Sequence, residues 1–311
     1  MKKLRSFIRL MRPKHYLKNA LVFVPLVYSF NLTNADLFFK AAVCYVALCL
    51  IASGIYAIND IIDYEKDKAH PKNKMRPIAA GEISKSAATN FAFFLFATGF
   101  GLITYYFGIF HSPPDGWWSH SGPGVVSVLF FCGLYVILNL VYSFNWKHVA
   151  IIDCFCIAAG FVLRIFIGGA AIGLTNISEW MFLTIAAGSL FMAFGKRRGE
   201  LIQLGETGRK VLNGYNLEFL NGAVFSCAAI SIIFYALWAM TSESQMVYTV
   251  PLIIFIICKY LLNTHTENSY GDPVAIIFGD KVLIGAIVVF GLLSILFLYP
   301  WALRLFPGQK F

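Results

Sequence analysis

Charged residues are scarce in this chain of 311 residues, where Asp, Glu, Lys and Arg together make up only 13%. Soluble globular domains carry about 25% charged residues, so the low value excludes an ordinary soluble protein. Hydrophobic residues make up 59% of the chain, and the mean hydropathy is +0.70. We therefore expect an all-α integral membrane protein in which 1–311 form a single polytopic domain.

Cysteines in metal-site or disulfide patterns are also missing. All seven cysteines lie in apolar runs, and none has zinc-ligand spacing with a histidine, so we expect neither a zinc site nor a disulfide framework. No small-residue cleavage site follows the basic N-terminus, so the apolar stretch after it is expected to be a retained helix. The net charge of +9 comes mostly from basic residues at helix ends, and it predicts no nucleic acid partner.

Long apolar runs predict the membrane crossings. A helix needs about 20 mostly apolar residues to cross the hydrocarbon core. A helix that is partly shielded can be somewhat shorter, and on this basis nine stretches are candidates, although the first is short and Pro25 interrupts it. The nine are 17–30, 38–58, 86–109, 124–143, 149–173, 179–195, 219–240, 247–263 and 281–302.

Lys and Arg are concentrated in alternate loops. Most of them lie in the N-terminal segment and in the loops 59–85 and 196–218, whereas 108–123, 174–178 and 241–246 contain none. Because basic residues mark the cytoplasmic side, we expect a cytoplasmic N-terminus, an external C-terminus and a location in the cell inner or plasma membrane. Residues 1–16 mix basic and apolar side chains, which predicts an amphipathic segment on the cytoplasmic membrane surface.

Three aspartates follow the second apolar run, at Asp60, Asp63 and Asp67. On a helix with about 100° per residue, they lie within about 60° of one another. Like charges in this arrangement repel, so we expect a compensating divalent cation. Mg²⁺ prefers oxygen ligands and is usually held by carboxylates together with substrate phosphates. The alternative, a solvated helix end neutralised by Lys66 and Lys68, stays open.

The motif Asn59-Asp60-x-x-Asp63-x-x-x-Asp67, followed by Arg76-Pro77-Ile78-x-x-Gly81, resembles the first aspartate motif of the UbiA superfamily of membrane prenyltransferases. The resemblance covers essentially the whole chain. It implies a UbiA-type bundle of nine transmembrane helices with a cytoplasm-facing active cavity, and 59–85 and 196–218 as its catalytic loops. It also implies that the three aspartates are catalytic and bind Mg²⁺ and the diphosphate of a substrate.

The second aspartate-rich motif of that superfamily is absent from the loop after the sixth run. Lys196-Arg197-Arg198 stand there instead, and within 194–200 Glu200 is the only acidic residue. Basic side chains bind phosphate groups directly. This departure resembles the decaprenyl-phosphate phosphoribosyltransferase branch of the superfamily, as do Arg12-Pro13-Lys14-His15-Tyr16-x-Lys18-Asn19, Lys147-His148, Asp153 and Gly160-Phe161-Val162-Leu163-Arg164.

The resemblance implies Mg²⁺-dependent transfer of 5-phosphoribose from soluble phosphoribosyl diphosphate (PRPP) to a membrane polyprenyl phosphate, with release of diphosphate. A homo-oligomer is compatible with this activity. Three roles stay open: His148 is either a phosphate or ribose contact or an ordinary interfacial histidine, Glu200 is either a ligand or an arginine partner, and Arg164 is either functional or structural. The residues expected to bind substrate are Lys14, Lys18, Asn59, Arg76, His148, Asp153, Lys196, Arg197, Arg198 and Glu200.

Two other functions remain as alternatives. A prenyltransferase that moves a polyprenyl group from its diphosphate to an aromatic or other small acceptor would share the first aspartate motif, but the basic residues at 196–198 disfavour it. A cation transporter would need carboxylates near the bilayer midplane at broken helices. The aspartates here cluster at one membrane face, which disfavours transport.

Overall fold

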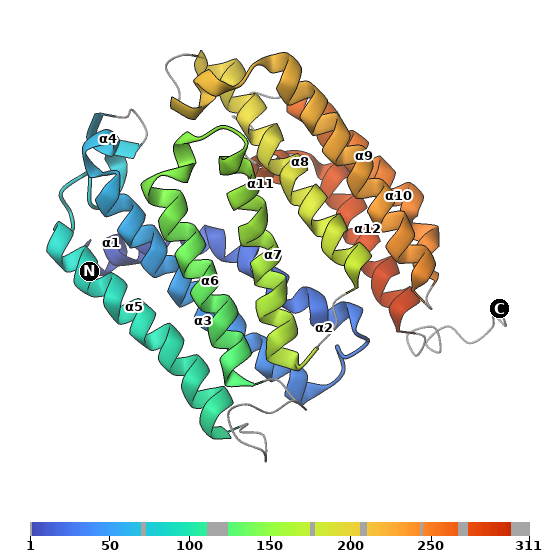
Figure 1. The fold of residues 1–311 in the computed structure, drawn as a ribbon, viewed down its shortest axis with the longest axis horizontal. Helices are drawn as coiled ribbons and strands as arrows, with labels where there is room; N and C mark the ends of the chain where they lie inside the picture. Colours follow the sequence, from blue (N-terminus) through green and yellow to red (C-terminus); the bar gives the residue numbers. More distant parts are fainter. Residues whose placement is uncertain are drawn as a thin grey trace. The chain divides into compact units, whose positions relative to one another are not determined.

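The computed structural model describes residues 2–69, 73–110, 124–174, 178–205, 210–242, 245–266 and 273–299. Within these ranges every regular element is helical (Figure 1). The α-helices are α1 (Lys2–Met11), α2 (Val24–Tyr28), α3 (Ala35–Ile62), α4 (Tyr64–Ala69), α5 (Lys85–Tyr105), α6 (Val125–Phe144), α7 (Ile152–Ile172), α8 (Glu179–Leu204), α9 (Leu217–Thr241), α10 (Val250–Thr266), α11 (Pro273–Gly279) and α12 (Lys281–Leu298).

Short turns of other helix types connect several of these elements. The π-turn η3 (Tyr106–Phe110) continues α5. The others are 3₁₀ turns: η1 (Pro13–Phe23), η2 (Asn73–Met75), η4 (Trp146–His148), η6 (Lys210–Gly214) and η7 (Gln245–Thr249).

Seven helices in the described part of the chain are long and apolar enough to cross a membrane. They match seven of the nine predicted crossings, with ends that differ by a few residues. The spans are Ala35–Ile62, Lys85–Gly108, Val125–Phe144, Ile152–Ile172, Leu217–Thr241, Gln245–Thr264 and Lys281–Leu298.

The other two predicted crossings, 17–30 and 179–195, do not satisfy the same requirement. The first is divided between the 3₁₀ turn η1 and the short α2, which has Pro25 in its first turn. The second belongs to α8, a continuous helix of 26 residues. Glu179 at its start and the basic residues from Lys196 onward shorten its apolar stretch. Nine crossings therefore stay a prediction.

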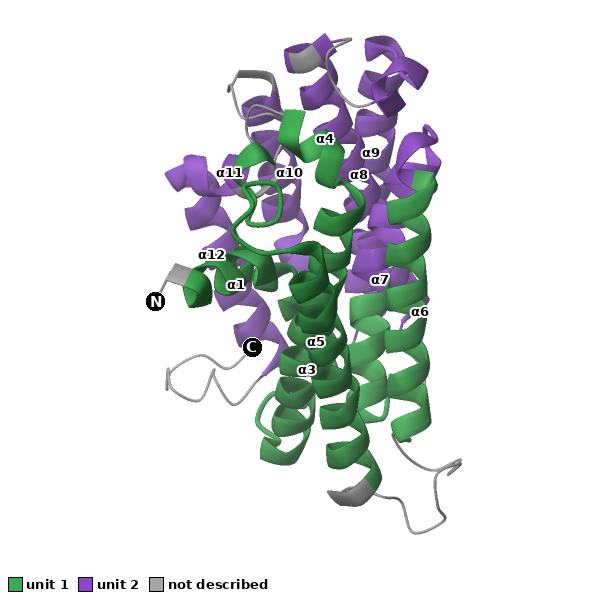
Figure 2. Cartoon of the chain, turned by 90° about the vertical axis from the view of Figure 1, so that its left-hand side faces the viewer, with its two compact units in different colours: residues 1–146, 163–176 green, residues 147–162, 177–311 purple. Residues whose placement is uncertain are grey.

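The chain forms two compact units (Figure 2). Unit 1 comprises Met1–Trp146 and Leu163–Asn176, and unit 2 comprises Lys147–Val162 and Ile177–Phe311. Helix α7 contributes its first part to unit 2 and its last part to unit 1. The predicted residues of the first aspartate motif therefore lie in unit 1, and the basic residues at 196–198 lie in unit 2.

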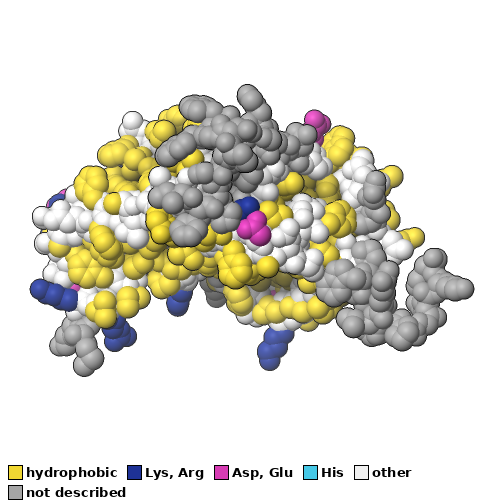
Figure 3. Space-filling view, turned by 90° about the horizontal axis from the view of Figure 1, so that it is seen from below, with side chains coloured by type: hydrophobic (Ala, Val, Ile, Leu, Met, Phe, Trp, Pro, Cys, Tyr) yellow, Lys and Arg dark blue, Asp and Glu magenta, His cyan; other side chains and the backbone are white. Residues whose placement is uncertain are grey.

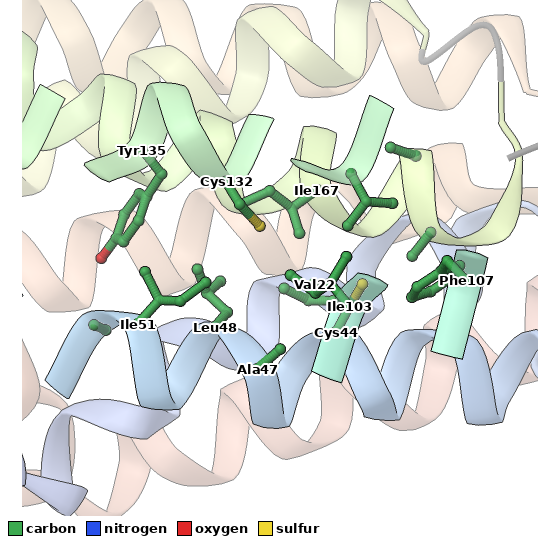
Figure 4. Close-up of a cluster of buried hydrophobic side chains, with 14 of the residues drawn as sticks. Val22, Cys44, Ala47, Leu48, Ile51, Ile103, Phe107, Cys132, Tyr135 and Ile167 are labelled. Atoms are coloured by element: carbon green, nitrogen blue, oxygen red, sulfur yellow. The ribbon is translucent and has the colours of Figure 1, made fainter. Parts of the chain in front are cut away.

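The core of unit 1 is built around α3. Leu48 and Ile51 from α3 lie opposite Cys132 and Tyr135 from α6 (Figure 4). Small residues dominate the buried face of α3, among them Ala41, Cys44, Ala47, Ala52, Ser53 and Gly54. Within a membrane, helices associate through close packing of such small residues, because the lipid is as apolar as the side chains.

The core of unit 2 is built around α8 and α9. Phe191 and Phe194 from α8 pack with Leu220 and Val224 from α9 and with Tyr260 from α10. Outside the cores, many large apolar side chains are exposed, and they cover much of the face seen in Figure 3. Large exposed apolar patches in a soluble protein mark an interaction surface. Here they are the expected surface towards lipid.

Helix α1 docks on unit 1 through one face. Leu10 is fully buried among Ala57, Ile78 and their neighbours, and the ring of Phe7 lies 4.7 Å from that of Phe91. Leu4 and Ile8 on the outer face are 67% and 48% exposed. Helix α1 therefore has two apolar faces. The face with Phe7 and Leu10 packs against the rest of unit 1, and the face with Leu4 and Ile8 is exposed. That this exposed face lies on the membrane surface stays a prediction.

The close packing of α7 against η1 in unit 1 can be tested at Gly168. A Cβ atom at this position of α7 would lie 2.1 Å from the carbonyl oxygen of Val22 in η1. Because a backbone atom cannot rotate away, Gly168→Ala should destabilise the protein by about 3 kcal/mol. The measurement is the thermal unfolding midpoint in detergent. Gly133→Ala is the matched control, since open space surrounds that position, and an equal loss in both variants would contradict the packing.

Docking of α1 should also depend on pH. Arg9 and the Ser6 hydroxyl, which both donate to Glu82, hold the pKa of that carboxyl below its ordinary value. Such a group stabilises the folded arrangement above its unfolded pKa of about 4.3, and the contribution is lost as the pH falls through the lower folded-state pKa. The distance between spin labels at Leu4 and Lys85 should therefore lengthen and broaden in acid.

The control for this experiment is Glu82→Gln, which removes the titrating group. It should give a broad distance distribution at neutral pH as well as in acid. A variant that still sharpens between acid and neutral pH would show that another group controls the docking of α1.

Candidate active site

The predicted aspartates lie where α3 ends and α4 begins. The amide of Asp63 donates to the Asn59 carbonyl at 2.9 Å, and the amide of Asp67 donates to the Asp63 carbonyl at 2.8 Å. Helical geometry therefore continues across the break at Asp63, as the spacing of the motif requires. Asp60 and Asp67 are buried, whereas Asn59 and Asp63 are partly exposed.

Arg76 connects the two buried carboxylates. Its Nη1 lies 2.6 Å from Oδ2 of Asp67 and 3.3 Å from Oδ1 of Asp60. Arg12 forms a second ion pair with Asp60, and the Asn73 amide donates to Oδ1 of Asp67 at 2.9 Å. We call these five residues the aspartate group.

Arg12 reaches Asp60 from an unusual backbone conformation. Its φ of 54° and ψ of 59° place it in the left-handed region, directly between α1 and Pro13. The guanidinium also lies over the ring of Tyr56, 5.2 Å from the ring centre. Strained backbone of this kind persists where surrounding contacts compensate for it, and such positions cluster at functional sites.

The aspartate group is electrically balanced, because two carboxylates face two guanidinium groups. Buried carboxylates require such partners, since an unpaired charge in a low-dielectric interior is very costly. The oxygens of Asp60 and Asp67 are the donor type that Mg²⁺ prefers, and a cation, Arg76, already lies between them. In the described part of the chain, no three carboxylate, His or Cys side chains converge as a metal centre. Two carboxylates supply only part of a Mg²⁺ coordination shell, so this donor set would suit a metal that is shared with phosphate oxygens.

A second polar cluster lies in unit 2. Arg197 donates from Nε to Oδ2 of Asp153 at 2.5 Å and from Nη1 to Oε2 of Glu200 at 2.6 Å. The Tyr215 hydroxyl donates to the other oxygen of Asp153 at 2.6 Å. All four side chains are buried. We call them the Arg197 network.

The Arg197 network changes how the basic segment at 196–198 is interpreted. The guanidinium of Arg197, a predicted phosphate ligand, is engaged by two carboxylates. Glu200 takes the second of its two open roles, as an arginine partner. Arg198 is also buried, but it donates to Asn221 Oδ1 at 2.6 Å and to the Thr264 carbonyl, which are both neutral. These hydrogen-bond partners of Arg198 thus carry no charge, and Lys196 is partly exposed.

The remaining predicted site residues are more accessible. Lys14 and His148 are exposed, and Lys18 is partly exposed. Their roles in binding substrate stay predictions. Within each unit the structure gathers three predicted site residues, namely Asp60, Asp67 and Arg76 in unit 1 and Asp153, Arg197 and Glu200 in unit 2.

Arg164 has structural contacts deep in unit 1. Its Nε donates to Asn19 Oδ1 at 2.9 Å and its Nη2 to the Tyr135 hydroxyl at 2.8 Å. The guanidinium carbon also lies 4.8 Å from the centre of the Tyr135 ring. These contacts favour the structural alternative for this residue.

Sequence reasoning did not select Arg12 or Tyr215. Arg12 had a usable signal, because it is a basic residue beside a proline at the predicted cytoplasmic surface. Tyr215 had none, since its partners Ile151 and Asp153 are 64 and 62 residues away in the chain. Contacts of that separation are set by the packing of helices and not by local pattern.

The chain matches a known protein family over most of its length. The profile of the UbiA prenyltransferase family matches residues 20–278. A protein of Corynebacterium glutamicum named decaprenyl-phosphate phosphoribosyltransferase is 33% identical over 89% of this chain and 82% of its own length. A Mycolicibacterium smegmatis protein of the same name is 32% identical over 89% of this chain and 87% of its own length.

Solved structures share the fold. A UbiA homologue from Archaeoglobus fulgidus, described as bound to DMAPP and Mg²⁺, superposes with a TM-score of 0.67 at 19% identity, over 93% of this chain and 99% of its own. A digeranylgeranylglyceryl phosphate synthase gives 0.65 at 18% identity, over 96% and 99%. Together with the seven apolar helices, these matches identify the chain as a multi-pass membrane transferase that belongs to the UbiA prenyltransferase family.

Proposed function

We propose that this protein transfers 5-phosphoribose from PRPP to a membrane polyprenyl phosphate in a Mg²⁺-dependent reaction. The observation that carries the proposal is the similarity, over about nine-tenths of the chain, to proteins named decaprenyl-phosphate phosphoribosyltransferase. Lys196 and Arg198, in the loop where the resemblance described above implies acidic residues in most prenyltransferases of the superfamily, suit the same substrates. Both substrates carry phosphate groups, and basic side chains suit them.

The aspartate group would bind the diphosphate of PRPP. Asp60 and Asp67 would hold Mg²⁺, with Asp63 as the third predicted ligand and Asn59 beside them. When bound, the metal neutralises charge that develops on the leaving diphosphate. The charges of the aspartate group balance one another in the absence of ligand. A bound divalent cation would add two positive charges, and the negative charges of an incoming diphosphate would offset them. Arg12 and Arg76 can then donate to phosphate oxygens without leaving the site.

The proposed reaction requires little proton transfer by the protein. The bond between C1 of the ribose and the diphosphate breaks, and a bond between C1 and an oxygen of the lipid phosphate forms. Because the lipid phosphate is already an anion, no strong general base is needed. The protein's task is to align two anionic substrates, which positioned cations can do. We assign this task to Lys14, Lys18, Lys196 and Arg198, and we assign His148 a contact with phosphate or ribose.

The orientation in the membrane is part of the proposal. We propose nine crossings with the N-terminus in the cytoplasm and the C-terminus outside, so that both catalytic loops open to the cytoplasm. The support is the distribution of Lys and Arg along the sequence. In this orientation, soluble PRPP can reach the catalytic loops from the cytoplasm, while the acceptor stays in the bilayer.

Two other functions are less well supported. A prenyltransferase acting on a polyprenyl diphosphate and a small acceptor shares the fold, and a farnesyltransferase of Archaeoglobus fulgidus is 28% identical, but over only 35% of this chain. Cation transport requires carboxylates near the bilayer midplane, whereas Asp60 and Asp67 lie at a helix end.

Product formation tests the proposal directly. Purified protein in liposomes, incubated with Mg²⁺, labelled PRPP and a polyprenyl phosphate, should produce a labelled lipid and free diphosphate. Turnover of a polyprenyl diphosphate with 4-hydroxybenzoate, and none of PRPP, would favour the prenyltransferase instead. Cation flux without any product would favour a transporter.

Asp60→Asn tests the metal role of the aspartate group. It should lower turnover by about 100-fold or more, because a neutral amide is a poor Mg²⁺ ligand. It should also remove the increase in thermal midpoint that Mg²⁺ and diphosphate together produce in the wild type. Asp36→Asn is the matched control, since Asp36 is an exposed residue in the first turn of the same helix, where it pairs with Lys40. Near-normal turnover in Asp60→Asn would refute the metal role.

A further inference from the structure

Ile151 has a backbone conformation that its side chain disfavours. Its φ of 69° lies in the left-handed region, where a β-branched residue is a clear outlier. The side chain is 44% exposed, so burial of the isoleucine does not account for the conformation. The residue stands between η4, which ends at His148, and α7, which begins at Ile152. The backbone conformation of Ile151 therefore sets the direction of the chain between η4, which contains Lys147 and His148, and the start of α7.

The hydroxyl of Tyr215 holds this turn. It accepts a hydrogen bond from the Ile151 amide at 2.6 Å and donates one to Oδ1 of Asp153 at 2.6 Å. Burial raises the pKa of the Tyr215 hydroxyl, which keeps its proton available for donation. The other oxygen of Asp153 accepts from Arg197. One hydroxyl thus links the turn at Ile151 to α8 through the Arg197 network.

Tyr215 itself is fixed independently of the hydroxyl. Its ring stacks on Phe219 with centroids 6.0 Å apart, and the side chain is only 8% exposed. Just before it, a Cβ atom on Gly214 would lie 2.9 Å from Cβ of Ala150. The end of the loop 196–218 therefore packs directly against the turn that follows His148. Phenylalanine at 215 would keep the ring packing and lose the hydrogen bonds of the hydroxyl, which join it to Ile151 and Asp153 and, at 3.5 Å, to the sulfur of Cys154.

We infer that Tyr215 is a positioning residue that holds the segment 147–151, and with it Lys147 and His148, in the arrangement used to bind the soluble phosphorylated substrate. This inference rests on the proposed function for the identity of that substrate. Tyrosine suits the role because its hydroxyl both donates and accepts. Asp153 and Arg197 then act through Tyr215 and do not bind phosphate themselves.

The first experiment compares Tyr215→Phe with the wild type in liposomes. The KM for PRPP should rise about tenfold, as expected when a backbone amide and the buried carboxylate of Asp153 each lose a partner, while kcat stays within about threefold. Tyr248→Phe is the matched control, because Tyr248 is an exposed tyrosine of the same unit. Its KM should equal that of the wild type.

The second experiment asks whether the backbone at Ile151 carries the effect. Glycine adopts a φ near +69° without side-chain strain, so Ile151→Gly added to Tyr215→Phe should lower the KM again by at least about threefold. An unchanged KM in Tyr215→Phe, or a raised KM that the glycine does not lower, would overturn the inference.

Hydrogen exchange separates this inference from the proposed function. In Tyr215→Phe, peptides covering 147–153 should exchange faster than in the wild type, because the Ile151 amide has lost its acceptor. This measurement needs no substrate. Absence of labelled lipid from the wild type would refute the proposed function alone, whereas unchanged exchange in Tyr215→Phe would refute the role of Tyr215 alone.

Discussion

The pairing of buried carboxylates with arginines is the constraint on which both polar clusters depend. Asp60, Asp67 and Asp153 are buried in a chain that is otherwise strongly apolar. An ionised carboxylate in such surroundings is stable only beside a positive charge and further hydrogen-bond donors. The helices of each unit are therefore arranged so that a guanidinium reaches each of these carboxylates. Two of the arginines that satisfy this requirement, Arg76 and Arg197, are predicted functional residues, whereas Arg12 is not.

The two clusters satisfy the requirement with different charge balances. In unit 1, Arg12 and Arg76 match Asp60 and Asp67, so a metal ion and an anionic substrate can enter together without leaving a large net charge. In unit 2, one guanidinium, that of Arg197, serves two carboxylates. That cluster is therefore suited to holding its surroundings in place, and under the proposed function the cations outside it would bind phosphate. The difference separates a binding role from a positioning role.

The sign of the charges in a short stretch of sequence does not predict the net charge of the site that the same residues form in the folded chain. Lys196, Arg197 and Arg198 are consecutive and suggest a strongly basic segment. In the folded chain, the charge of Arg197 is taken up by Asp153, which is 44 residues away, and by Glu200 on the next turn of α8. Consecutive residues on a helix point in different directions. Their environments, and hence their functions, are set separately by the helices they face.

The sequence by itself determined the helical membrane class, seven of the apolar helices and the family, because apolar run length, loop charge and the spacing at Asp60, Asp63 and Asp67 are local properties. It also identified Arg76, which lies only 16 residues from Asp60. Only the tertiary structure decided that Arg12 completes the aspartate group, that Arg197 faces carboxylates and that Tyr215 holds Ile151. Each of those contacts joins segments that are distant in the chain, and their meeting depends on how whole helices pack.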